Sequence, residues 1–486
     1  MSTKCWSTLI GIVCLHAAVS GQETKALTPA QQTAIQFVEQ QRQVLWELNR
    51  SIWKYAEIGL QEKQSVAAIV HLLRRHGFEV ELGVAGMPTA FVATYGSGRP
   101  IIGILAEYDA LPGLSQAVAP QRKPLEPDGA GHACGHSALG SAAVGAALAV
   151  KHALAKHGLQ GTVRLYGTPA EETGIGKVYM LRAGLFRDLD ACLHWHPGTK
   201  NQVLYSTSKA IASIKFTFHG IPAHASASPQ DGRSALDAVE LMNVGVNYMR
   251  EHVKEDARFH YVITDGGGQP NVVPPRAQVW YYVRANDHDD MVRYARWIMD
   301  IARAAALMTQ TKVDIQVVTD NHELIPNRPL SELLYRNFKR IGPPRFSDEE
   351  RAFARQLQEP LVAQLGKHID RPLHEEIAPL PDEPTAMKGS TDVGDISWFV
   401  PTSGIGTACF AYESPGHSWQ NVAAVGSSIG NKGLLVAAKV LAATAVELYE
   451  QPTLLEAARK DLRQRRGNRR YESLIPADQK PPQRIR

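Results

Sequence analysis

Hydrophobic and polar positions divide the first part of the chain into alternating helices and strands. Apolar residues spaced three and four apart predict helices, whereas short apolar runs predict strands. Strands that alternate with helices favour an α/β fold with a mainly parallel sheet covered by helices. Functional side chains in such sheets gather at the carboxyl ends of the strands. The expected helices are 32–59, 65–77, 138–157 and 176–183, and the expected strands are 78–82, 89–95, 101–106, 161–167 and 191–193.

The pattern changes near residue 206, where strand-like and helix-like segments follow one another closely. We interpret this block as the compact order β-α-β-β-α-β of an inserted α+β domain. After residue 321 the first domain resumes. We therefore predict a catalytic domain built from 22–205 and 321–486, with a smaller domain inserted at 206–320. The segments are strands 210–219, 279–284 and 312–318 and helices 234–252 and 291–307, followed by helices near 329–341 and 431–450.

The beginning of the chain has the pattern of a secretory signal. Lys4 precedes an apolar run at 9–15, and the small residues at 17–21 offer a cleavage site. About ten apolar residues are too few to span a bilayer, so we expect export to the periplasm or outside the cell. We expect no later stretch to be long and apolar enough to cross a membrane.

Composition and charge narrow the range of partners. Hydrophobic residues make up 44% and charged residues 21% of the 486, as in an ordinary folded protein. The net charge of +4 comes from residues 456–486, where ten lysines and arginines face four acidic residues. The rest of the chain gives no reason to expect nucleic acid. We expect the tail to be a solvated, partly disordered extension that packs its Tyr471 and Leu474 locally. Of the cysteines, Cys5 and Cys14 fall in the signal, and the remaining ones do not form a disulfide framework.

Polar side chains collect where the expected strands end. Cys134 and His136 are two residues apart before a helix, and a thiolate with an imidazole suits zinc, or manganese if carboxylates join. A buried cysteine beside a loop histidine is the alternative. Glu171 and Glu172 follow strand 161–167, where one carboxylate can bind a metal while the other activates a water. A solvated acidic helix start is equally consistent with that pair.

Three further histidines strengthen the case for a metal centre. His194 and His196 stand at the end of the next strand, and His417 lies in a turn rich in glycine and proline. Each signal is weak alone. Together with the cysteine and the glutamates, these residues predict a hydrolytic metal centre.

The order of the motifs resembles that of the metal-dependent aminoacylase/carboxypeptidase family. The resemblance covers the chain after the signal and is to the amidohydrolase branch, with hippurate hydrolase, indole-acetyl-amino-acid hydrolase and p-aminobenzoyl-glutamate hydrolase. It implies a zinc-peptidase-like catalytic domain with an inserted ferredoxin-like lid, and a homodimer formed through that lid. The motifs are residues 55–59 (YAEIG), 105–112 (LAEYDALP), 131–136 (GHACGH), 169–172 (PAEE), 220–225 (GIPAHA), 271–274 (NVVP) and 389–395 (GSTDVGD).

The resemblance also implies roles for single residues. The ligands of two divalent ions, manganese or zinc, are then Cys134, His136, Glu172, His196 and His417, with Glu171 as the general base. His196 is favoured over His194 because it lies six residues after Asp190 and directly before a proline, as the family ligand does. His224 of the lid is expected to polarise the scissile carbonyl, often from the neighbouring subunit. Asn271 and Arg284 are expected to meet the carboxylate or carbonyl of the substrate.

Two departures from the family pattern bear on the substrate. Ser137 replaces a common aspartate, and Glu107-Tyr108-Asp109 replaces an Asp-Met-Asp triplet, and both resemble the p-aminobenzoyl-glutamate hydrolase side of the branch. We therefore expect an amidohydrolase that uses a metal-activated water. Its substrate is expected to be a small-molecule amide, an N-acyl or N-aroyl amino acid. The alternatives are a dipeptidase or carboxypeptidase of the same family and a non-catalytic metal-binding periplasmic protein. Glu171 argues against the last, because a binding protein needs no base.

Overall fold

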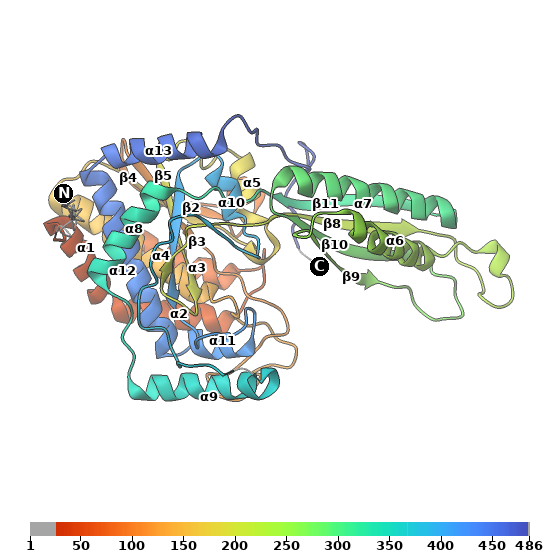
Figure 1. Cartoon of the computed structure of the whole chain (residues 1–486), viewed down its shortest axis with the longest axis horizontal. Helices are drawn as coiled ribbons and strands as arrows, with labels where there is room; N and C mark the ends of the chain where they lie inside the picture. Colours follow the sequence, from red (N-terminus) through yellow and green to blue (C-terminus); the bar gives the residue numbers. More distant parts are fainter. Residues whose placement is uncertain (1–25, 367, 485–486) are drawn as a thin grey trace, which may run out of the picture.

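The computed structural model describes residues 26–366 and 368–484, which form two lobes (Figure 1). The larger lobe holds a seven-stranded sheet and most of the helices. The smaller lobe projects from it and holds a four-stranded sheet with two long helices. The predicted signal at 1–21 lies outside the described residues and stays a prediction.

The sheet of the larger lobe has a parallel centre and antiparallel edges. Its strands are β1 (Glu79–Leu82), β2 (Phe91–Ser97), β3 (Ile101–Ala106), β4 (Gly161–Gly167), β5 (Ala191–Gly198), β6 (Gln202–Val203) and β13 (Thr402–Ala408). Their order in space is β1-β2-β4-β3-β5-β13-β6. The central strands β4, β3, β5 and β13 run parallel, whereas β1, β2 and β6 pair antiparallel with their neighbours. The expected α/β class with a mainly parallel sheet is confirmed.

Helices cover both faces of this sheet. Ile102 and Ile104 of β3 point into a core shared with the long helices α4 and α12, which pack against each other. Leu105, the next residue, points into a separate core on the opposite face, together with residues of α5. The helices of the larger lobe are α1 (Pro29–Gln40), α2 (Arg42–Tyr55), α3 (Lys63–Arg75), α4 (His136–His157), α5 (Gly176–Arg182), α8 (Arg328–Ile341), α9 (Asp348–Leu365), α10 (Val393–Ser397), α11 (Trp419–Val425), α12 (Ser428–Glu450) and α13 (Thr453–Arg466).

The two central helices correct one expectation from the sequence. By length and composition alone α4 and α12 are apolar enough to cross a membrane, although no such segment was expected. In each helix 83% of the apolar window is buried inside the fold. A helix that is hydrophobic on all sides is suited to the centre of a large core, and both helices occupy that position.

The smaller lobe, which we call the second domain, has the β-α-β-β-α-β order. Its elements are β8 (Ala210–His219), α6 (Ala235–Met249), β9 (Arg258–Asp265), β10 (Arg276–Ala285), α7 (His288–Thr309) and β11 (Lys312–Asn321). The antiparallel sheet has the order β11-β8-β10-β9, and α6 and α7 pack together on it. This is the ferredoxin-like arrangement. Strand β9 was not predicted, because most of its side chains are exposed and its apolar residues do not alternate.

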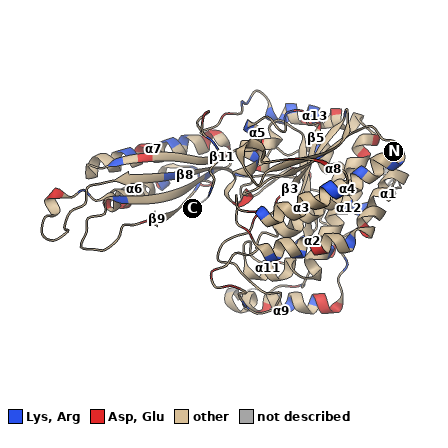
Figure 2. Ribbon diagram, turned by 180° about the vertical axis from the view of Figure 1, so that it is seen from behind, with Lys and Arg blue, Asp and Glu red and all other residues tan. Residues whose placement is uncertain are grey.

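The C-terminal segment (467–484) does not extend into solvent, and that expectation is wrong. It leaves α13, on which basic residues gather (Figure 2), and crosses from the larger lobe onto β11. The ring of Tyr471 stacks on His322 at 4.2 Å, and its hydroxyl donates to Asp395 at 2.9 Å. The backbone N–H of Leu474 donates to Asp320 at 2.5 Å. The segment therefore ties the end of β11 to the larger lobe.

Several element boundaries also differ from the prediction. The single helix expected at 32–59 is two helices, α1 and α2, which meet at Gln41. Strand β5 extends to Gly198, so that His194 and His196 lie within the strand. Short elements complete the structure: β7 (Ser206–Thr207), β12 (Thr385–Ala386), and the 3-10 turns η1 (Val84–Gly86), η2 (Glu171–Thr173), η3 (Pro229–Asp231) and η4 (Arg250–His252).

Candidate active site

The candidate residues meet at the carboxyl edge of the parallel strands. Glu107 directly follows β3, and η2, which begins with Glu171, follows β4. His196 is near the end of β5, and the loop after β13 carries His417. Because the carboxyl ends of parallel strands meet at one edge of the sheet, residues far apart in the sequence come together there.

His136, the first residue of α4, is held in one orientation. Its Nδ1 atom lies 2.9 Å from Oδ1 of Asp109, so the ring donates there and leaves Nε2 available as a ligand. Gly135 makes the preceding turn with φ of 88°. A Cβ at this position would lie 2.8 Å from Pro197 and 2.9 Å from Phe410. Glycine is needed here because it both adopts the left-handed conformation and allows this close approach.

Cys134 and His196 face each other across the site. The Sγ atom lies 3.3 Å from Nε2 of the histidine. The other ring nitrogen, Nδ1, is 2.7 Å from the carbonyl oxygen of Pro197, which places its proton on Nδ1. The Nε2 lone pair is therefore directed toward the thiol, as metal binding requires.

His194 lies in the same cavity but in a different setting. Side chains alternate along a strand, so His194 and His196 are on the same side of β5, and Trp195 between them donates to Leu139 on α4 at 3.0 Å. Burial lowers the pKa of His194 to about 4. Its Nε2 atom has no hydrogen-bond partner among the residues that the structure describes, and it belongs to none of their candidate ligand groups.

Glu172 and His417 form the other side of the cluster. Oε2 of Glu172 is 3.4 Å from Nε2 of His417. The backbone N–H of Glu172 donates to Oδ2 of Asp109 at 3.0 Å, so one aspartate positions both Glu172 and His136. His417 has φ of 54°, a left-handed conformation that is uncommon outside glycine. Such local strain is typical of functional sites.

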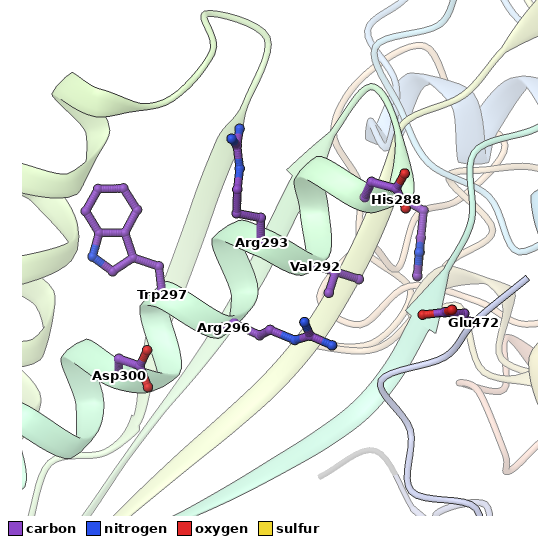
Figure 3. A pocket seen from close by; sticks show the side chains of 8 residues that line it. His288, Val292, Arg293, Arg296, Trp297, Asp300 and Glu472 are labelled. Carbon is purple, nitrogen blue, oxygen red and sulfur yellow. The ribbon is translucent and has the colours of Figure 1, made fainter. Parts of the chain in front are cut away.

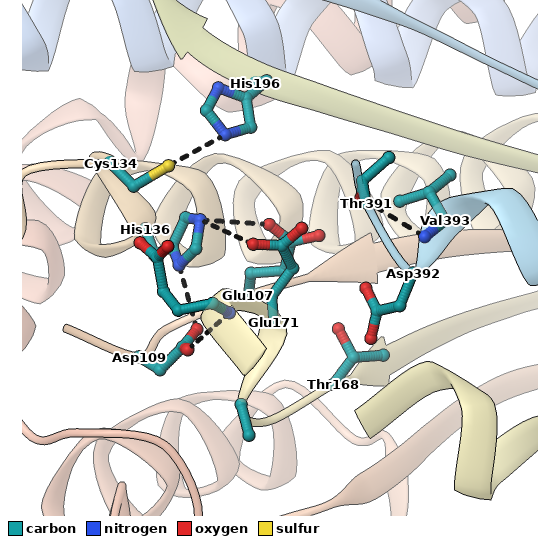
Figure 4. A network of polar contacts seen from close by, with 12 residues as sticks. Glu107, Asp109, Cys134, His136, Thr168, Glu171, His196, Thr391, Asp392 and Val393 are labelled. Carbon is teal, nitrogen blue, oxygen red and sulfur yellow. Dashed lines mark hydrogen bonds and ion pairs between the residues drawn. The ribbon is translucent and has the colours of Figure 1, made fainter. Parts of the chain in front are cut away.

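Several carboxylates of this cluster, including Glu107, Asp109 and Glu171, lie around His136 (Figure 4). Oε2 of Glu171 is 3.8 Å from Nε2 of His136. Burial, together with the nearby Glu107 carboxylate, raises the pKa of Glu171 well above its usual value. Burial likewise raises the pKa of Glu172 to about 7. A divalent ion next to these groups reverses the preference, because its charge favours the ionised forms.

The donor set fits divalent metal ions. Nε2 of His136 and Oε1 of Glu172 are buried, and within the described part of the chain they have no hydrogen-bond partner. Atoms of this kind are costly to bury unless an ion or water satisfies them. Three overlapping groups have ligand atoms within 4.8 Å of one another: Cys134, His136 and His196; Cys134, Glu172 and His417; and Glu107, His136 and Glu171. Every ligand expected from the sequence occurs in these groups.

A cavity of about 550 Å³ opens from the cluster toward the second domain. Tyr282 and Arg284 of β10 line its wall, so the second domain contributes to it. Nη1 of Arg284 donates to Oγ of Ser390 at 3.2 Å, and burial lowers the pKa of its guanidinium. The size suits a small-molecule ligand. The cavity places Arg284, one of the two expected substrate-binding residues, next to the metal cluster.

A second hollow of about 520 Å³ lies along α7, between that helix and Glu472 (Figure 3). Its lining includes Arg293, Arg296 and Trp297 of the exposed helix surface. None of the three candidate ligand groups found in the described chain contributes to it. We therefore assign the chemistry to the first cavity.

His224 and Asn271 are not brought to this site. Both are exposed, and His224 pairs with Val272 in the loops at the free end of the second domain. These loops adjoin Arg276 at the start of β10, whereas Arg284 lies eight residues further along, about 26 Å away at roughly 3.3 Å per residue. Neither residue lines the cavity.

Sequence reasoning missed a buried ion network below the cluster. Nζ of Lys177 lies 2.8 Å from Glu107 and 2.6 Å from Asp392, and the side chains of all three residues are almost fully buried. Glu107 and Asp392 lie within the sequence motifs, but the motifs assigned them no role. Lys177 follows Gly174-Ile175-Gly176 and carries no local signal, because its partners come from the residue directly after β3 and from the segment after β12. Asp109 also gained its role only from the fold.

The fold and this donor set define a metal-dependent hydrolase of amide bonds. The model of peptidase family M20/M25/M40 matches residues 103–451. The chain belongs to this family.

Individual relatives agree with that assignment. The B chain of the p-aminobenzoyl-glutamate hydrolase of Escherichia coli (strain K12) is 39% identical over 466 residues, which cover 91% of this chain and 97% of that protein. The Xaa-Arg dipeptidase of Mus musculus is 30% identical over 451 residues, 88% of this chain and 91% of that protein. The aminobenzoyl-glutamate utilization protein from Klebsiella pneumoniae shares the fold with a TM-score of 0.58 at 18% identity, covering 86% of this chain and 98% of that one.

Proposed function

We propose that this protein hydrolyses the amide bond of N-aroyl or N-acyl amino acids of the p-aminobenzoyl-glutamate type. One observation carries the proposal: five metal-ligand candidates surround Glu171 in a chain that is 39% identical, over nearly its full length, to one chain of a p-aminobenzoyl-glutamate hydrolase. The cavity of about 550 Å³ is large enough for such a substrate.

The residues of the site divide the reaction between them. The ions, when bound, supply polarisation of the substrate carbonyl and a more acidic water. Glu171 accepts a proton from the attacking water and donates it to the leaving nitrogen, which is general acid–base catalysis by one carboxylate.

Arg284 is the group that we assign to the substrate carboxylate. Its guanidinium lines the cavity, and its Nε atom is buried without a hydrogen-bond partner in the described residues. A carboxylate can accept two parallel hydrogen bonds from a guanidinium. This arrangement supports an amino-acid product, because every N-acylated amino acid retains its α-carboxylate.

We propose two divalent ions, manganese or zinc, held by Cys134, His136, Glu172, His196 and His417. A thiolate and three imidazoles favour zinc, and the carboxylates also suit manganese. A protein of Bacillus subtilis described as a dinuclear metal binding peptidase of the M20 family shares the fold; it has a TM-score of 0.53 at 17% identity and covers 85% of this chain and 99% of that one.

We also propose a homodimer formed through the second domain, which acts as a lid. The part of β10 between the loops that carry His224 and the cavity-lining Arg284 is about 26 Å long. A rotation of the second domain about its base keeps this separation, so closure cannot bring His224 to the cavity of its own chain. A partner subunit is the remaining source for a residue with the expected role. The edge strand β9 and helix α6 expose apolar side chains suited to contact with a second copy, namely Leu241, Val244, Tyr248, Tyr261 and Ile263.

A different, related chain is the alternative partner, because the Escherichia coli relative is named as one subunit of a hydrolase.

Export and the domain division are retained as proposals. The proposal of export rests on the pattern of residues 1–21, and the proposed domains are 22–205, 206–320 and 321–486. N-terminal sequencing of the protein recovered outside the cytoplasm tests the proposal of export.

A hydrolysis screen tests the proposed function. The full chain is reconstituted separately with Mn²⁺ and Zn²⁺, and product release is followed by chromatography. The substrates are p-aminobenzoyl-glutamate, hippurate, an N-acetyl amino acid and an Xaa-Arg dipeptide. We expect the highest kcat/KM with p-aminobenzoyl-glutamate and none with the Glu171→Gln variant. Efficient cleavage of the dipeptide alone, as the 30% identity to the dipeptidase allows, would overturn the substrate assignment.

A further inference from the structure

Glu107 occupies an unusual position at the edge of the metal cluster. It follows the last residue of β3, and only 4% of its surface is exposed. Its Oε1 atom lies 2.8 Å from Nζ of Lys177. Its other oxygen, Oε2, faces Nε2 of His136 at 3.3 Å, yet neither atom has a hydrogen-bond partner within residues 26–366 and 368–484. Two buried polar atoms therefore face each other without a bond between them.

The tautomer of His136 explains why these atoms need a cation. Because Nδ1 donates to Asp109, the neutral ring has a bare lone pair on Nε2. That lone pair is directed at a carboxylate oxygen, which also has only lone pairs. Two acceptors so close together are unfavourable unless a positive charge lies between them. Without a metal, a proton on Nε2 supplies that charge, and the raised pKa of His136 favours it; a bound divalent ion takes the place of this proton.

The spacing of the two atoms matches shared metal coordination. Donor atoms about 2.0–2.1 Å from one ion at a tetrahedral angle lie about 3.3 Å apart. Glu107 and His136 have this separation. The expected ligand pairs have nearly the same one: 3.3 Å between Cys134 and His196, and 3.4 Å between Glu172 and His417. Glu107 is thus placed as the recognised ligands are.

Lys177 leaves only one oxygen of Glu107 available to an ion. The ammonium of Lys177 holds Oε1 of Glu107, so only Oε2 can reach an ion. Lys177 is itself fixed, because its backbone N–H donates to Asp392 at 3.0 Å and its Nζ lies 2.6 Å from the same carboxylate. The side chain of Lys177 is fully buried. Such support orients a ligand and strengthens its binding.

We propose that Glu107 is a further metal ligand, binding the ion held by His136, and that Lys177 is its positioning residue. The ion held by His136 then has an additional carboxylate oxygen among its donors, which suits harder ions such as manganese as well as zinc. The proposal concerns the metal centre, and it can be tested by metal binding without any assumption about the substrate.

Metal binding by two variants tests the proposal. Glu107→Gln keeps the size of the side chain but removes the charge, and Glu107→Asp keeps the charge but shortens the reach. The control is Glu62→Gln, which makes the same change in another buried carboxyl, one bonded to Thr89 and to the backbone of Ala170. Apoprotein is titrated with Mn²⁺ and, separately, Co²⁺ against a chelator of known affinity, and the Co²⁺ absorption spectrum is recorded.

We expect Glu107→Gln to lose affinity for one of two ions by at least about tenfold and to change the Co²⁺ spectrum. Glu107→Asp should show a smaller loss, and Glu62→Gln should bind both ions like the wild type. Wild-type affinity and spectrum in Glu107→Gln would overturn the proposal, as would an equal loss in the control. If Glu107→Gln does not fold, a wild-type spectrum and affinity in Glu107→Asp overturns it instead. Failure of the substrate screen leaves these readouts unchanged, so the two proposals fail separately.

Discussion

Oδ1 of Asp109 lies 2.9 Å from Nδ1 of His136, and both side chains are completely buried. The second oxygen of Asp109 accepts the backbone N–H of Glu172. A single carboxylate thus fixes two candidate ligands that come from different elements, α4 and η2. Burial alone would raise the pKa of Asp109, but His136 and the hydrogen bonds outweigh it and lower that pKa, which keeps the carboxylate ionised.

Replacing this aspartate should weaken metal binding without removing a ligand. In Asp109→Asn an amide can donate to Nδ1, which favours the tautomer with its proton on Nε2. Changes of this kind typically cost about 10–100-fold in metal affinity. Chelator-competition titration measures the loss, and Asp188→Asn, which alters an exposed ion pair with Arg164, is the control. Equal affinities in the two variants would show that Asp109 has no such role.

Removing the general base should separate chemistry from metal binding. Glu171→Gln cannot accept a proton from water, so turnover should fall by about 10²–10⁴-fold or more. Metal content, measured by elemental analysis of the dialysed protein, should remain that of the wild type. Near-normal turnover with intact metal content would contradict the assignment.

The two histidines of β5 should differ in their effect on metal content. His196 has its Nε2 atom 3.3 Å from the Cys134 thiol, whereas His194 belongs to none of the ligand groups in the described residues. His196→Ala should therefore lower metal occupancy more than His194→Ala. Elemental analysis of both variants, purified in parallel, decides the matter. The opposite order would show that the ligand is His194.

A mixing experiment tests whether His224 acts from a partner subunit. His224→Ala should bind metal normally and lose about 10²–10³ in turnover if the histidine stabilises the developing oxyanion. Mixed with Glu171→Gln after mild dissociation, it should regain activity, because some sites then combine an intact base with an intact histidine. No recovery on mixing would exclude donation between subunits, and full activity of His224→Ala alone would remove the residue from the mechanism.

Acid should destabilise the junction between the lobes through His322. Burial and the neighbouring His288 lower the pKa of His322 to about 3. The unfolded chain takes up a proton below about pH 6.5, which the folded protein does not, so the free energy of unfolding falls as the pH falls. Between pH 6.5 and 5 the loss is about 2 kcal/mol.

His322→Phe retains an aromatic ring in the stack between His288 and Tyr471 but cannot titrate. Urea unfolding at pH 6.5 and 5 should therefore show a smaller loss for the variant than for the wild type. Equal losses would show that His322 titrates normally in the folded state.

The sequence was sufficient for the parts of the fold and site that depend on local pattern. Three of the four central parallel strands, the second domain and the clustered ligand candidates follow from alternation and from polar residues at strand ends. The fourth central strand, β13, was not predicted, and neither were α9, α10, α11 and α13. Strand β9 was missed because its side chains are mostly exposed.

Other features depend on distant contacts that no local pattern contains. Lys177 is buried because Glu107 and Asp392 reach it from two other segments. His224 fits a motif, yet the length of β10 keeps it away from the cavity of its own chain. The charge of the tail indicated a solvated extension with Tyr471 and Leu474 packed locally, whereas the partners of these two residues lie far away in the sequence, on α10 and β11.

The crossing of the C-terminal segment onto β11 also sets an order of assembly. Every candidate ligand lies before residue 418, whereas the contacts of Tyr471 and Leu474 are made by residues synthesised later. Domains generally fold as units while the chain emerges from the ribosome. The metal cluster and the second domain can therefore form first, joined by the hydrogen bonds of Thr319 and Asn321 on β11 to Gly174 and of Asn321 to Asp395. The contacts of Tyr471 and Leu474 are added afterwards. A premature stop after α12 would yield a chain with all its ligands but a weaker junction, a defect that metal analysis alone would not detect.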